Sequence, residues 1–157
     1  MFEGGIVLQH LREDLTEKGI VIGREVQIRP GQFTDIHVDG VATCDNADRL
    51  NIIKVIVEVK GCWNVGMEQD MEGQLLERYM NENSCNHGLF LVGWFHCDSW
   101  DQRDYRSKRP SEKITEMSIE KVQELLDRQS AELSGRTGKV IRAFVLDSRM
   151  RKSDLSA

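Results

Sequence analysis

The spacing of apolar residues along the chain alternates between helical steps of three or four residues and the shorter steps typical of strands. Residues 2–18 carry Leu11 and Leu15 at helical spacing and run into Gly19, a typical helix C-terminus. We therefore expect a first helix there. Apolar residues then recur over 20–28, and alternate with polar ones over 33–40, which predicts two strands with a turn between them.

The run from 52 to 60 is almost entirely β-branched until Glu58 and Lys60, which predicts a central strand buried on both faces. Because side chains alternate along a strand, Glu58 and Lys60 are expected on the same face. Four-residue steps from Met67 to Tyr79 predict a helix over 65–81. The remaining expected elements are a strand over 87–95, a polar loop over 97–115, a helix capped by Ser118 and ended by Gly135, and a strand over 139–146.

This order of elements predicts the α/β class. Three early strands without helices between them indicate a meander, and the later strand-helix-strand unit indicates parallel pairing, so we expect a mixed β-sheet flanked by helices on both faces. No Gly-, Ser- or Pro-rich linker divides the chain. Residues 1–148 are therefore expected to form a single domain, followed by a polar C-terminal tail over 149–157.

Composition narrows the class of protein. The 157 residues include 21 Lys plus Arg and 26 Asp plus Glu, a net charge of −5, and 39% of them are hydrophobic. These values are typical of a globular protein and disfavour one that coats nucleic acid through bulk charge. No apolar run is long enough to cross a bilayer, and the first residues lack the basic start of a signal peptide. We expect a cytoplasmic protein with no membrane partner.

Charged residues at the end of a buried strand need partners, because burying a charge costs free energy. Glu58 and Lys60 end one such strand, and Asp35 lies on the polar face of the strand expected beside it. Two carboxylates and a lysine at one sheet edge are suited to Mg²⁺, which prefers one or two carboxylates together with water and phosphate oxygens. The alternative is a surface ion pair between Glu58 and Lys60.

The sequence Thr34-Asp35, then Glu58-Val59-Lys60, then Gln74 resembles the motif of the PD-(D/E)XK (restriction-endonuclease-like) nuclease superfamily. The resemblance extends over most of the chain, because the expected elements match that family's αβββαβ core, followed here by a helix and a further strand. It implies that Asp35 and Glu58 bind Mg²⁺, with Mn²⁺ as a substitute, and that Lys60 assists the nucleophile. Thr34 stands where the motif has proline.

The branch related to RecB-type nucleases has a glutamine on the next helix and a tyrosine four residues later. Gln74 matches this glutamine and joins the expected catalytic set, whereas Arg78 stands at the tyrosine position and Tyr79 follows it. Arg78 is one turn from Gln74 and is a candidate phosphate contact. Tyr79 is expected in the core.

Basic and aromatic residues outside the motif are candidates for nucleic-acid binding. Besides Arg78, the candidates are Arg29, Trp63, Arg103 and Arg106. Core packing is the structural alternative for Trp63, and a solvated loop is the alternative for Arg103 and Arg106.

Together these features predict a Mg²⁺-dependent endonuclease that hydrolyses phosphodiester bonds in DNA, as the effector domain of a larger bacterial defence or restriction protein. We expect targeting to come from a fused regulatory region or from a second copy of the chain. Two alternatives stay open: a Holliday-junction resolvase-like nuclease, which the net charge of −5 disfavours, and a non-catalytic nucleic-acid-binding module that keeps the fold.

Overall fold

The computed structural model describes the backbone of residues 20–24, 27–29, 32–33, 36–43, 50–98, 101–108 and 116–149, and the side chains of 36–40, 53–98, 101–107 and 116–149. The helix expected over 2–18 and nearly all of the expected tail over 149–157 lie outside these residues. The described elements are β1 (Ile20–Arg24), β2 (Gln27–Arg29), β3 (Gln32–Phe33), β4 (Ile36–Thr43), β5 (Leu50–Gly61), α2 (Met67–Asp70), η1 (Met71–Asn81), β6 (His87–Trp94), η2 (Tyr105–Lys108), α4 (Ile119–Thr137) and β7 (Val140–Asp147).

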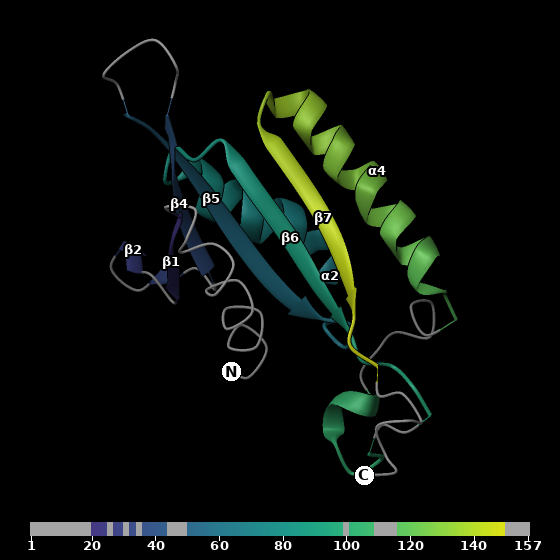
Figure 1. Ribbon diagram of the computed structural model, residues 1–157. Coiled ribbons are helices and arrows are strands. Elements are labelled where there is room, and N and C mark those ends of the chain that lie inside the picture. Colours follow the sequence, from purple (N-terminus) through teal and green to yellow (C-terminus); the bar gives the residue numbers. More distant parts are fainter. Residues whose placement is uncertain are drawn as a thin grey trace.

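A mixed five-stranded sheet in the order β1-β4-β5-β6-β7 forms the centre of the fold (Figure 1). β1, β4 and β5 pair antiparallel, and β5, β6 and β7 pair parallel. The predicted meander and the predicted parallel unit are both confirmed, and so is the α/β class. The single strand expected over 20–28 is instead two strands, because β2 leaves the main sheet and pairs with β3.

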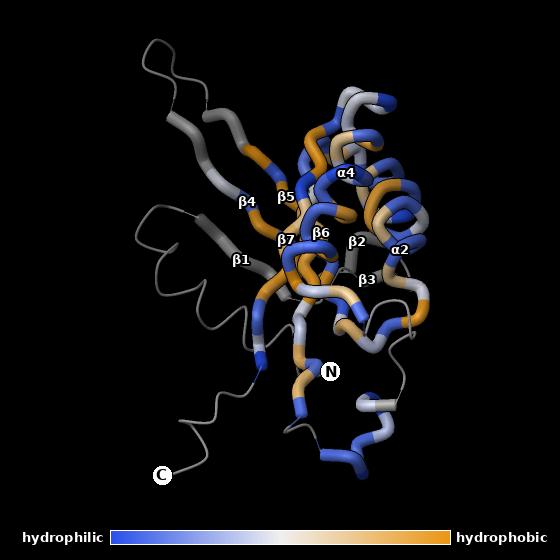
Figure 2. Tube along the Cα trace, turned by 90° about the vertical axis from the view of Figure 1, so that its right-hand side faces the viewer, coloured by the Kyte–Doolittle hydropathy of each residue, from blue (hydrophilic) through white to orange (hydrophobic). Residues whose placement is uncertain are grey.

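The continuous helical segment of α2 and η1 and the helix α4 cover the same face of the sheet (Figure 2). Buried side chains of that face alternate along the parallel strands, from Ile56 of β5 through Phe90 and Val92 of β6 to Ile141 of β7, and they pack against η1 and α4 in one core cluster. A second, smaller cluster on the opposite face contains Ile36, Val57 and Leu91. The prediction of helices on both faces depends on the segment 2–18 and therefore stays a prediction.

The helix expected over 65–81 begins as α2 and continues as the π-helix η1. In a π-helix each N–H bonds five residues back rather than four. Residues four or five apart therefore share a face, and the buried residues of η1 follow that spacing: Met71, Leu75, Leu76, Tyr79 and Met80. The core position expected for Tyr79 is confirmed. The four-residue steps in the sequence indicated a helix without distinguishing these two windings.

Helix α4 begins as predicted, with the Ser118 hydroxyl accepting a hydrogen bond from the backbone N–H of Lys121. Its predicted end at Gly135 is wrong. The helix continues to Thr137, and Gly138 adopts the left-handed conformation (φ 70°) that closes the C-terminus. Gly138 has no Cβ to oppose that conformation, so it is the better stop.

Helix α4 runs alongside β7, the last strand in the described sheet (Figure 1). Gln123 accepts a hydrogen bond from the backbone N–H of Val145 and donates one to the carbonyl of Ala143. Ser134 bonds both the N–H and the carbonyl of Ile141. Polar side chains of α4 thus occupy the backbone groups that an edge strand would otherwise offer to another strand. Among the described residues, no helix is long and apolar enough to span a membrane.

Candidate active site

Glu58, Lys60 and Gln74 meet at the carboxyl end of β5. Alternation along the strand places Glu58 and Lys60 on the helix-covered face, as predicted. The ammonium of Lys60 lies 2.7 Å from Oε1 of Glu58 and donates a hydrogen bond of 2.8 Å to Oε1 of Gln74 on η1. The three residues named by the motif are therefore in direct contact, although 14 positions separate Lys60 from Gln74.

A fourth residue, Asp70, belongs to this cluster. Its Oδ2 lies 3.4 Å from Nζ of Lys60, and its Oδ1 accepts a hydrogen bond of 3.0 Å from Nε2 of Gln74. Sequence analysis missed Asp70. The available signal was its position four residues before Gln74, a spacing that brings two side chains together on a helix.

The cluster is largely withdrawn from solvent. The Glu58, Lys60 and Asp70 side chains are 4%, 11% and 14% exposed. Burial lowers the pKa of Lys60, but the hydrogen bond to Glu58 and the negative charges of Glu58 and Asp70 outweigh that effect and raise the pKa above its usual value. Lys60 is therefore a firmly protonated cation at neutral pH.

Asp35, the other carboxylate of the predicted metal site, lies outside the described residues. The residue after it, Ile36, pairs with Val57, the residue before Glu58. His37, on the next position of the polar face, is directly opposite Ile56, and its Nε2 lies 3.2 Å from Oδ1 of Asp39. The polar face of β4 is therefore continuous with the face of β5 that carries Glu58.

A hard divalent cation would need carboxylate oxygens here. Within the described part of the chain, no three His, Cys, Asp or Glu side chains are grouped closely enough to hold a metal ion. The described cluster supplies Glu58, whose buried carboxylate is of the type that Mg²⁺ prefers. Glu58 thus fits the role of one ligand, and Asp35, the second ligand that the resemblance implies, lies outside the described residues.

Trp63 packs at the edge of the site. Its ring lies 5.4 Å from that of Phe95, and the guanidinium of Arg106 lies 5.2 Å from its centroid on the ring face. Gly61 makes room for this ring, since an added Cβ would lie 2.5 Å from it. Trp63 therefore fastens the loop after β6 to the end of β5.

The structure describes the side chains of three other predicted nucleic-acid contacts, Arg78, Arg103 and Arg106. Arg103 and Arg106 form ion pairs with Asp101 and Asp104, each two residues earlier. Arg78 is exposed on η1, with its guanidinium 5.5 Å from the Tyr79 ring. Arg29 is the last residue of β2, and its side chain lies outside the described part.

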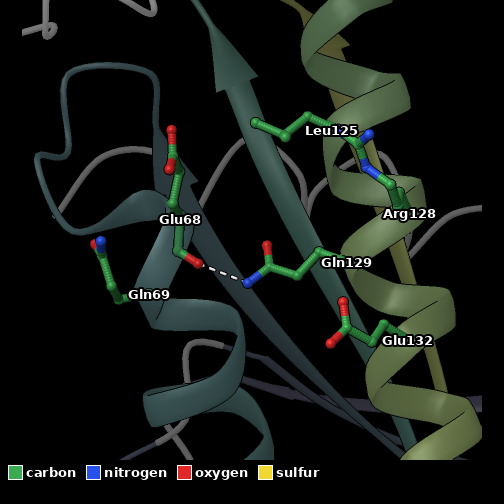
Figure 3. Close-up of a pocket in the computed structure, with 6 residues that line it drawn as sticks. All are labelled: Glu68, Gln69, Leu125, Arg128, Gln129 and Glu132. Carbon is green, nitrogen blue, oxygen red and sulfur yellow. Dashed lines mark hydrogen bonds between the residues drawn. The ribbon is translucent and has the colours of Figure 1, made fainter.

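A separate pocket of about 310 Å³ lies between α2 and α4 (Figure 3). None of the predicted site residues lines it. Its main structural feature is the hydrogen bond of 2.6 Å that Nε2 of Gln129 donates to the backbone oxygen of Glu68. This bond and the ion pair of Arg136 with Glu72 fasten α4 to the helical segment that carries Asp70 and Gln74.

Comparisons of the chain with protein-family models, with curated proteins and with solved structures gave no match. The site therefore has to be interpreted from its own chemistry.

Proposed function

We propose that this chain is a metal-dependent endonuclease of the PD-(D/E)XK type that hydrolyses phosphodiester bonds in DNA. One observation carries the proposal: Lys60 joins Glu58 on its own strand to Gln74 on the following helix through contacts of 2.7 and 2.8 Å. The motif resemblance names these same three residues. A surface ion pair, the alternative interpretation, does not account for a carboxylate that is 4% exposed.

The proposed chemistry divides the work among four side chains. Glu58 and Asp35 would hold Mg²⁺, which activates water and offsets phosphate charge when bound. The Lys60 ammonium would hold the attacking water or an oxygen of the scissile phosphate, a role that requires the protonated state. The raised pKa of Lys60 supports that state at neutral pH. Gln74 would orient the Lys60 ammonium by accepting a hydrogen bond from it.

The test uses supercoiled plasmid DNA with Mg²⁺ or Mn²⁺. We expect nicking by the wild type and none by Asp35→Ala, Glu58→Gln or Lys60→Ala. Lys54→Ala is the matched control, because Lys54 is an exposed lysine on the same strand. Equal cleavage by the wild type and the three site variants would contradict the assigned site. A four-way junction and an RNA duplex, offered in parallel, test the choice of substrate.

A further inference from the structure

Asp70 has a position that the motif does not explain. It contacts both Lys60 and Gln74, and Gln74 also contacts Lys60, so the three side chains close a ring of polar contacts of 2.8, 3.0 and 3.4 Å. Glu58 contacts Lys60, at 2.7 Å from its ammonium. The ring therefore holds Lys60 from the helix side, whereas Glu58 holds it from the strand side.

We infer that Asp70 is a positioning residue that retains Lys60 when the Glu58 carboxylate turns to a divalent cation. This inference rests on the proposed function, since it assumes that Glu58 is a metal ligand. A divalent cation bound to Glu58 would offset the carboxylate charge that attracts Lys60 and would itself repel the Lys60 ammonium. Gln74 offers only a neutral oxygen, so Asp70 supplies the one remaining anionic partner that the structure shows for Lys60.

The absence of a side chain at Gly66 leaves space for the Asp70 carboxylate. Gly66 is the N-cap residue of α2, and its carbonyl accepts a hydrogen bond of 2.8 Å from the backbone N–H of Asp70. A Cβ added at Gly66 would lie 3.1 Å from Oδ1 of Asp70 and 3.4 Å from Oδ2. The missing side chain at Gly66 therefore leaves the space that the Asp70 carboxylate occupies, and Gly66→Ala offers a steric way to displace that carboxylate without removing it.

The experiment compares the wild type with Asp70→Asn, which has the same shape without the charge, with Asp70→Glu, which restores the charge, and with Gly66→Ala. Glu77→Gln is the control, because it removes one exposed carboxylate from the same helix. Four quantities are measured: thermal stability, Mn²⁺ affinity by calorimetry, the rate of plasmid cleavage, and the rate at which an amine-acylating reagent labels Lys60 with and without Mn²⁺. Lys54, exposed on the same strand, calibrates the reagent.

We expect Mn²⁺ to leave Lys60 protected in the wild type and in Glu77→Gln, and to expose it to the reagent in Asp70→Asn. Cleavage of plasmid DNA should fall about tenfold to a hundredfold in Asp70→Asn, as is typical when a residue supporting a metal site is lost, while Mn²⁺ affinity changes much less. Asp70→Glu should recover part of the rate, and Gly66→Ala should lie between the wild type and Asp70→Asn.

The outcomes separate this inference from the proposed function. Equal labelling of Lys60 in the wild type and Asp70→Asn, or equal cleavage, overturns the role of Asp70 while the nuclease assignment stands. Protection that depends on Asp70 in a chain that binds Mn²⁺ but cuts no DNA supports the positioning role and contradicts the nuclease. A wild type that binds no Mn²⁺ overturns both.

Discussion

At the scale of single residues, the site is defined by charged groups that are largely withdrawn from solvent. Glu58 is buried on the helix-covered face of the sheet, where Ile56 of the same strand and Phe90 and Val92 of β6 belong to the apolar core. An isolated carboxylate in such a place would be strongly unfavourable, so its pairing with Lys60 contributes to the stability of the fold.

Replacing Lys60 should therefore destabilise the fold. We expect Lys60→Met to lower the free energy of unfolding by about 3–5 kcal/mol, because it leaves Glu58 buried without its cation. The double variant Glu58→Gln/Lys60→Met should be more stable than Lys60→Met alone. Urea denaturation measures both. Lys54→Met, at an exposed position of the same strand, should change stability by about 0.5 kcal/mol or less. A Lys60→Met variant as stable as that control would refute the argument.

The raised pKa of Lys60 predicts a pH dependence of stability. A lysine whose pKa is higher in the folded state binds its proton more tightly there, so its contribution is complete below the unfolded value of about 10.4 and is lost as pH rises through the folded value. The wild type should therefore lose stability at alkaline pH more steeply than Lys60→Met does. Urea midpoints from neutral pH to pH of about 11 give the two curves, and parallel curves would contradict the prediction.

At the scale of elements, the position of Gln74 depends on how closely η1 approaches the sheet. The approach is set by Gly88 on β6, because an added Cβ would collide with the sulfur of Met80 and lie 3.3 Å from Leu75. Both of those residues are completely buried, so their side chains can move only by displacing other parts of the core. A side chain at position 88 would push η1 away from the sheet and Gln74 away from Lys60.

We expect Gly88→Ala to cost about 1–3 kcal/mol of stability through overpacking and to reduce cleavage as well. Gly73→Ala is the matched control on η1 itself, since nothing lies within 4 Å of its added Cβ. Alanine is also the better helix former, so that variant should be at least as stable as the wild type. Chemical denaturation measures the free energy of unfolding of both variants. A Gly88→Ala variant as stable as the wild type would show that this glycine does not set the distance between η1 and the sheet.

Helix α4 protects the β7 edge of the sheet through hydrogen bonds between its side chains and the backbone of that strand. Gln123→Ala removes both hydrogen bonds to the backbone of β7 and should cost about 1–3 kcal/mol, taking two bonds at about 0.5–1.5 kcal/mol each. It should also increase self-association, because it exposes backbone groups of an edge strand. Glu124→Ala, at the exposed neighbouring position, is the control. Urea denaturation and size-exclusion chromatography at several concentrations measure the two effects, and a monomeric, fully stable Gln123→Ala would contradict them.

At the scale of the whole molecule, charge is balanced locally. The net charge is −5, and three arginines of the described part pair with an aspartate two residues earlier: Arg103, Arg106 and Arg149. Their guanidinium groups therefore contribute little positive potential at a distance. We expect the domain to bind DNA weakly without divalent metal, because few cations are available to displace counterions from the phosphates.

Removing the partner carboxylates should reveal this balance. Asp101→Asn/Asp104→Asn changes the net charge from −5 to −3 and leaves Arg103 and Arg106 without those ion pairs. DNA affinity should rise, and the slope of log affinity against log salt should become steeper by about two. Glu116→Gln/Glu124→Gln changes the charge equally at exposed positions and serves as the control. Fluorescence anisotropy across a salt series gives the DNA affinity and its salt dependence. Equal slopes for the two double variants would refute a role of Arg103 and Arg106 in DNA binding.

Much of the fold follows from local rules that the sequence displays directly. Strand alternation placed Glu58 and Lys60 on one face before any tertiary contact was known, and the β-branched run around them identified the central strand. The N-cap at Ser118 was equally local. The end of α4 did not follow from local sequence. Gly135 and Gly138 both satisfy the sequence pattern for a helix stop, and only the left-handed backbone at Gly138 decides between them.

By itself, the sequence determined the antiparallel meander, the parallel unit that follows it and the charged end of β5, because periodicity and β-propensity act over a few residues. Tertiary structure alone decided that Asp70 joins Lys60 and Gln74 and that α4 covers the edge of β7. These contacts depend on how far η1 winds and how closely the helices approach the sheet. That approach is the summed result of buried packing over the whole core, which no short stretch of sequence contains.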